Sequence, residues 1–149
     1  MDNIFITTLK KMSEWASHKS MWPLACGLSC CAIEMMHAAA SRYDLDQFGC
    51  LFRASPRHAD LMIVSGTVTN KMAPLIKNLY DQMLSSKFVI AMGNCAISGG
   101  LYAGSQSVLN GVSNIIPVDI NVPGCPPRPE DLINAILKLQ QRRSTKQST

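Results

Sequence analysis

The chain has 149 residues, of which 47% are hydrophobic and 16% charged, and its formal net charge is +4. This length suits a single domain that buries roughly 70% of the surface of its unfolded chain, and the apolar composition indicates that partners cover part of the folded surface. A charge this small is typical of a solubilising surface, and we expect no nucleic-acid partner. No run approaches the roughly 18 apolar residues of a membrane span, and the first residues lack the pattern of a secretory signal, so we expect neither a spanning segment nor export.

Residues 1–20 are expected to form an amphipathic N-terminal helix. Apolar side chains recur at helical spacing over residues 4–17, at Phe5, Leu9, Met12 and Trp15. Such a helix can lie on a membrane surface, on a partner or on its own domain, and the sequence leaves these alternatives open. A second helix is predicted from Ala32 to Ala40, directly after Cys31.

A βαβ unit follows. The apolar run 61–64 predicts a buried strand, residues 72–84 predict a helix, and residues 88–92 predict a second strand. Because the strands are almost continuously apolar, they indicate a parallel sheet covered by helices on both faces.

The rest of the chain extends this pattern. We expect a short helix near 105–109, a third strand over 115–122 and a final helix over 129–143 that has a proline at its start. The tail 144–149 has no apolar residue to bury and is expected to be disordered.

Six cysteines in a chain without an export signal indicate reducing surroundings, where clustered thiols more often bind metal or do redox chemistry than form structural disulfides. Cys95 follows the strand at 88–92, and Cys125 follows the strand at 115–122. Functional sites of open parallel α/β sheets form beyond the carboxyl ends of the strands, so these two loops are expected to face one another. The tandem pair Cys30 and Cys31 lies at a helix start, where thiolate is favoured. Four thiolates from three loops suffice to enclose one 4Fe–4S cluster.

Other uses of these thiols remain open on the residues alone. Buried cysteines are ordinary core residues, and we expect Cys26 and Cys50 to be of this kind. Structural zinc sites usually contain C-x2-C pairs, which are absent here, since three residues separate Cys26 from Cys30. A disulfide between Cys30 and Cys31 would be strained and would leave the two later cysteines without a role.

Long strings of the sequence resemble one known family. The strings GLSCCAIEMMHAAASRYDLDQFG, FRASPRHADLMIVSGTVTNKMAP, GNCAISGG and IIPVDINVPGCPPRPEDL closely resemble the NuoB/PSST subunits of respiratory complex I. The resemblance runs from about Trp15 to Arg143 and implies a flavodoxin-like iron–sulfur domain over residues 21–143. It also implies the ligands of one terminal 4Fe–4S cluster, at Cys30, Cys31, Cys95 and Cys125.

The function implied by the resemblance is electron transfer in a proton-pumping NADH:quinone oxidoreductase. Electrons from NADH or another donor would reach this cluster, which would reduce quinone in a cavity shared with the neighbouring large subunit. The chain would not be catalytic alone. In such families the helix after the tandem cysteines lines the quinone cavity, and the candidates here are Ile33, Glu34, Met35 and Met36, although core packing explains the two methionines equally well.

The implied partners are the large quinone-site subunit, the ferredoxin-like iron–sulfur subunit and the membrane arm. The implied place is peripheral, on the cytoplasmic face of a bacterial inner membrane or its matrix or stromal equivalent.

One departure from the family concerns the cysteines. The family string before the tandem pair is closer to TFGLACC, whereas this sequence reads LACGLSCC and so adds Cys26. We expect Cys26 not to be a ligand, because Cys30 and Cys31 occupy the tandem positions. Two alternative functions are the small subunit of a membrane-bound nickel–iron hydrogenase-type complex, in which C-x-x-C is favoured at the first site, and a scaffold whose thiols are structural or bind zinc.

Overall fold

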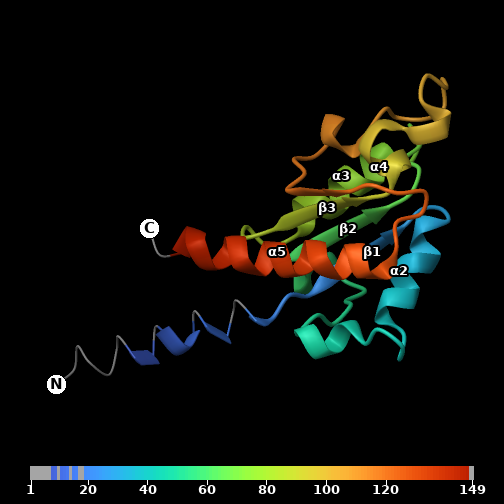
Figure 1. The fold of residues 1–149 in the computed structure, drawn as a ribbon. Helices are drawn as coiled ribbons and strands as arrows, with labels where there is room; N and C mark the ends of the chain where they lie inside the picture. Colours follow the sequence, from blue (N-terminus) through green and yellow to red (C-terminus); the bar gives the residue numbers. More distant parts are fainter. Residues whose placement is uncertain (1–7, 10, 14, 17–18, 148–149) are drawn as a thin grey trace.

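The computed structural model describes residues 8–9, 11–13, 15–16 and 19–147. Its centre is a sheet of four parallel strands in the order β1-β2-β3-β4 (Figure 1). The strands are β1 Pro23–Gly27, β2 Leu61–Ser65, β3 Phe88–Met92 and β4 Ile120–Val122. The predicted single α/β domain with a parallel sheet is confirmed.

A fifth segment lies on the free edge of β1. Two isolated parallel bridges join Met21 to Cys50 and Leu24 to Arg53, and the Arg53 amide donates to the Pro23 carbonyl at 2.8 Å. With this segment counted, β1 has a neighbour on each side: residues 50–53, which come next in the chain, lie on one side, and β2 lies on the other. This is the flavodoxin-like order, in which the first strand lies inside the sheet and the chain reverses direction beside it.

Helices cover both faces of the sheet, as the apolar strands predicted (Figure 1). They are α2 Cys31–Ala39, α3 Ala73–Gln82, α4 Asn94–Ser98 and α5 Pro129–Gln147. Four short 3-10 turns connect them, namely η1 Leu45–Phe48, η2 Pro56–His58, η3 Gly100–Tyr102 and η4 Val112–Asn114. Helices α2 and α5 share one core with the sheet, and α3 and α4 share the other.

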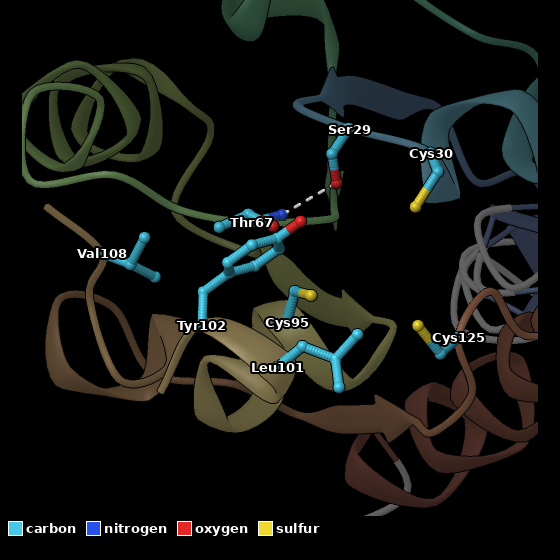
Figure 2. Close-up of a pocket in the computed structure, with 8 residues that line it drawn as sticks. All are labelled: Ser29, Cys30, Thr67, Cys95, Leu101, Tyr102, Val108 and Cys125. Carbon is cyan, nitrogen blue, oxygen red and sulfur yellow. Dashed lines mark hydrogen bonds between the residues drawn. The ribbon is translucent and has the colours of Figure 1, made fainter. Parts of the chain in front are cut away.

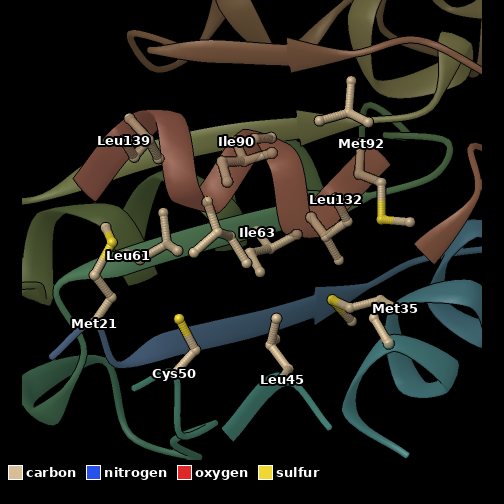
Figure 3. Close-up of a cluster of buried hydrophobic side chains, with 14 of the residues drawn as sticks. Met21, Met35, Leu45, Cys50, Leu61, Ile63, Ile90, Met92, Leu132 and Leu139 are labelled. Carbon is tan, nitrogen blue, oxygen red and sulfur yellow. The ribbon is translucent and has the colours of Figure 1, made fainter. Parts of the chain in front are cut away.

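Alternation along the strands explains why two cores form. Ile63 and Ile90 face α2 and α5, where they meet Leu132 and Leu139 of α5 (Figure 3). Their neighbours Met62, Val64, Val89 and Ala91 face the opposite core. All five residues of β2 are buried, so the central strand faces no solvent on either side.

A polar contact also joins α2 to α5. The hydroxyl of Tyr43, just beyond α2, donates a hydrogen bond of 2.9 Å to the Glu130 carboxylate in the first turn of α5. The backbone N–H of Glu130 and this hydroxyl both lower the pKa of the carboxyl group, and the bond raises the pKa of Tyr43. The end of α2 farther from Cys31 is thus fastened to the start of α5, a helix far from it in the sequence.

Two predicted elements differ from the structure, and one strand of the structure was not predicted. The expected strand 115–122 forms only at Ile120–Val122, since Pro117 has no N–H for a ladder and η4 occupies residues 112–114. The expected helix near 105–109 is a turn containing a bridge from Val108 to Thr69, and the helix of this region is α4 instead. Strand β1 was not anticipated.

The two chain ends also depart from simple expectation. Helix α5 continues to Gln147, four residues into the segment expected to be disordered, while residues 148–149 lie outside the described part. At the N-terminus, residues 8–9, 11–13 and 15–16 are helical, and Leu9, Met12 and Trp15 are 53%, 62% and 67% exposed. Their stripe therefore does not pack on the domain; Phe5 lies outside the described residues. No helix in the described part is long and apolar enough to cross a membrane.

Two cysteines belong to the cores. Cys26 lies in β1 opposite Val64 and packs on the α3 and α4 side, while Cys50 is fully buried on the α2 and α5 side. Burial raises the pKa of Cys26 to about 11. Burial, and secondarily two nearby aspartates, raises the pKa of Cys50 to about 12. The prediction that both are core residues is confirmed.

These raised pKa values predict slow alkylation. Only thiolate reacts, and at pH 8 a thiol of pKa about 11 is roughly 100-fold less ionised than one at the ordinary value of 9.0. We expect iodoacetamide at pH 8 to modify the exposed Cys30 and Cys125 of the isolated, metal-free chain and to spare Cys26 and Cys50, as measured by peptide mass spectrometry. Labelling of the two buried thiols should rise about tenfold per pH unit up to their pKa. Labelling in denaturant is the control, and equal labelling of all four in the folded chain would contradict the assignment.

Candidate metal centre

Three loops that carry cysteines meet at one edge of the sheet. Cys30 follows β1, Cys95 follows β3 and Cys125 follows β4. They line one cavity of about 390 Å³. Figure 2 shows their three sulfur atoms directed into a common space from three different parts of the chain. The expectation that the loops after the strands face one another is therefore met by the fold.

Cys31 lies behind this cavity and is only 2% exposed. Its thiol is close enough to the other three for each of them to act on it electrostatically. Burial first, and then Cys30, Cys95 and Cys125, raise the pKa of Cys31 to about 11. The structure thus brings together all four cysteines that the sequence singled out.

Glycines leave space for two of these sulfur atoms. Gly93, at φ +91°, lies so close to Cys31 that a Cβ atom there would clash with its Sγ. Gly100, at φ +54°, lies where a Cβ atom would be 3.0 Å from the Cys95 Sγ. At both positions φ is positive, and a cysteine sulfur atom lies where a side chain would need space. The sulfur atom is therefore a reason for glycine in addition to the backbone conformation.

Reciprocal hydrogen bonds join the Cys95 and Cys125 loops. The Asn94 N–H donates to the Gly124 carbonyl at 2.9 Å, and the Gly124 N–H donates to the Asn94 Oδ1 at 3.0 Å. The peptide bond between Cys125 and Pro126 is cis. Through the two hydrogen bonds, these two cysteine loops form one joined unit at the edge of the sheet.

The Cys30 turn is held by the loop after β2. The Thr67 N–H donates to the Ser29 Oγ at 3.0 Å, and the Leu28 N–H donates to the Ser65 carbonyl at 2.9 Å (Figure 2). Ser29 and Thr67 line the cavity with the cysteines, as do three residues of the later loops, Leu101, Tyr102 and Val108. Sequence reasoning missed these residues, although Thr67 could have been found because it lies only two residues after the end of β2.

The thiols surround the cavity rather than converge on one point. Within the described ranges, no three His, Cys, Asp or Glu side chains are close enough together to hold a single metal ion. A zinc ion binds four ligands at about 2.0–2.3 Å from one centre. A 4Fe–4S cluster instead takes one thiolate on each iron atom, and its ligands are spread around it.

The four candidates for a quinone cavity do not share one face of α2. Ile33 and Met36 are 64% and 62% exposed, whereas Met35 is buried in the core and accepts a contact of 3.7 Å from the Ser65 Oγ. Glu34 lies 3.6 Å from the His37 Nδ1. Ile33 and Met36 are therefore available to a ligand or partner, and Met35 has the core role that was the alternative.

Comparison with known proteins adds three findings. Residues 29–139 match the family described as NADH ubiquinone oxidoreductase, 20 kDa subunit. A solved chain of the membrane-bound sulfane sulfur reductase, an archaeal respiratory membrane complex, is 36% identical, with a TM-score of 0.85, and the match covers 90% of this chain and 76% of that one. A chain of an NAD+-reducing [NiFe]-hydrogenase in the H2-reduced state shares the fold alone, at 18% identity and a TM-score of 0.61 over 83% of this chain and 93% of that one.

The family match spans most of the described domain and includes all three cysteine loops. This chain belongs to the family of the 20 kDa subunit of NADH ubiquinone oxidoreductase, whose members typically bind a 4Fe–4S cluster through cysteines.

Proposed function

We propose that the chain is the electron-transfer small subunit of a membrane-bound respiratory complex, and that Cys30, Cys31, Cys95 and Cys125 hold one 4Fe–4S cluster. The observation that carries this proposal is the gathering of four thiols, from three loops, around one cavity at the carboxyl edge of the sheet. Cys26 and Cys50 are not proposed as ligands, because neither lines this cavity and neither is among the thiols that act on Cys31.

The residues around the cavity fit such a group. Gly93 and Gly100 leave room beside the Cys31 and Cys95 sulfur atoms, and the apolar side chains of Leu101 and Val108 line the cavity beside the cysteines. The bound cluster would supply one-electron transfer. The chain's own residues would fix the four thiolates, and the exposed Cys30 and Cys125 would mark the side from which a partner approaches.

The comparisons favour one kind of complex. The 36% identical chain comes from a sulfane sulfur reductase, so an assembly of the hydrogenase and sulfane sulfur reductase type is the first candidate. NADH:quinone oxidoreductase, which the sequence strings implied, becomes the second candidate. The family description and the exposed apolar residues Ile33 and Met36 favour it, because such residues suit an isoprenoid tail at the surface of α2.

In either assembly the chain would be a peripheral subunit. Its partners would include a large subunit facing the cluster, a ferredoxin-like iron–sulfur subunit that delivers electrons, and a membrane arm. The cytoplasmic face of the membrane, or its organellar equivalent, is the place proposed for it.

Analysis of the native complex purified from membranes tests these proposals. Iron and acid-labile sulfide should be present in amounts that include one cluster for this subunit, whereas zinc without sulfide would show a zinc scaffold. Electron transfer is then measured from NADH to quinone, between hydrogen and a viologen dye, and from a reduced donor to polysulfide. Activity with hydrogen or polysulfide supports the first candidate, and quinone reduction alone supports the second.

Replacement of a proposed ligand should remove the cluster. For Cys125→Ser in the complex we expect loss of the electron paramagnetic resonance signal of this cluster together with the electron-transfer activity, because a hydroxyl is a poor ligand for this site. Cys26→Ala is the control, because Cys26 is buried in the core on the α3 and α4 side and does not line the cavity. This variant should retain the signal and the activity. Retention of signal and activity in Cys125→Ser would remove this residue from the ligand set.

The space at Gly93 gives a second prediction. Gly93→Ala should strongly lower the iron and sulfide content of the complex, since the new Cβ would displace the Cys31 sulfur. Gly104→Ala is the control because Gly104 also has a positive φ, of +85°, and a Cβ atom added there would have nothing within 4 Å. Both variants place an alanine at a positive φ, which is unfavourable at either position. Equal losses in the two variants would mean that backbone strain, and not the sulfur, explains the glycine.

A further inference from the structure

Ser29 lies at the wall of the cluster cavity, one residue before Cys30. Its Oγ accepts a hydrogen bond of 3.0 Å from the Thr67 N–H (Figure 2). Its backbone carbonyl accepts from the Ala32 N–H at 2.9 Å, at the start of α2. Both the main chain and the side chain of this serine are thus fixed.

The neighbouring loop leaves room for this oxygen. Gly66, at φ +103°, approaches Ser29 so closely that a Cβ atom there would clash with the Ser29 Oγ. The glycine therefore allows the hydroxyl to lie between the β1 and β2 loops, on the boundary of the cavity that the cysteines share.

The hydroxyl hydrogen of Ser29 has no acceptor within the described part of the chain. A serine hydroxyl has one donor and two acceptor positions, and the contact with Thr67 uses only an acceptor position. Thr67 and Tyr102 also bring hydroxyl groups to the cavity, but no hydrogen bond of the described structure fixes either of those oxygens. Ser29 is the hydroxyl whose position is determined and whose proton is available.

We propose that the Ser29 hydroxyl donates a hydrogen bond to a sulfur atom of the cluster held in this cavity, either a ligand thiolate or an inorganic sulfide. This hydrogen bond would raise the reduction potential of the cluster. Reduction adds negative charge to these sulfur atoms, so a donor beside them stabilises the reduced state more than the oxidised state. The inference rests on the proposed cluster. Ser29 would be a positioning and tuning residue, not a ligand.

A redox titration of the intact complex tests the role of Ser29, with the cluster followed by electron paramagnetic resonance. Ser29→Ala should shift the midpoint potential to more negative values while iron and sulfide content stay at the native level. Alanine is the residue of the family string TFGLACC at this position, so the fold should accept it. Ser29→Thr keeps the hydroxyl and should titrate close to the native protein. Ser98→Ala is the matched control, because the Ser98 Oγ donates to the Asn94 carbonyl within α4 and does not line the cavity.

Two results would overturn the inference. One is an unchanged midpoint potential in Ser29→Ala with the cluster intact. The other needs no variant: an exchangeable proton strongly coupled to the reduced cluster should be seen by electron–nuclear double resonance when native complex in H2O and in D2O is compared, and its absence would exclude the hydrogen bond. A native complex that contains no cluster would instead refute the proposed function, so the two failures are distinguishable.

Discussion

The position of β1 inside the sheet is the constraint on which the site depends. Residues 50–53 pair with one edge of β1, and β2 pairs with the other. The chain therefore leaves β1 at the point where the strand order reverses. The tandem cysteines stand at that exit. Parallel pairing then brings the ends of β3 and β4, and with them Cys95 and Cys125, to the same edge. A site assembled from residues 30 to 125 thus follows from the strand order.

Much of the fold could be predicted because its elements have strong periodic signals. The apolar run at β2, the helix at α3 and the strand Phe88–Met92 all lie within about two residues of their predicted bounds. Strand β1 was missed because PLACG has neither alternation nor β-branched residues, and only its neighbours on both sides make it a strand. Helix α4 was missed because five residues between glycines give no helical period.

The site shows a similar division between local and global information. The rule about strand ends located Cys95 and Cys125, but nothing local showed that the turn at Cys30 and Cys31 lies beside them. That proximity results from β1 pairing, which the sequence pattern did not reveal. Cys26, four residues from Cys30, was set aside because the resemblance gives the tandem positions to Cys30 and Cys31. Its position in β1, facing the α3 and α4 core, separates it from the cavity.

The contact between Tyr43 and Glu130 has a consequence for electron transfer. It fastens the end of α2, the helix that begins with Cys31, to the start of α5, the helix that follows the Cys125 loop. The Cys31 and Cys125 segments are therefore connected through the core that α2 and α5 share, while hydrogen bonds join the Cys95 and Cys125 loops at the sheet edge. Thiols held in this way would move little when the charge of the proposed cluster changes. A low reorganisation energy would let electrons enter and leave quickly with only a small driving force.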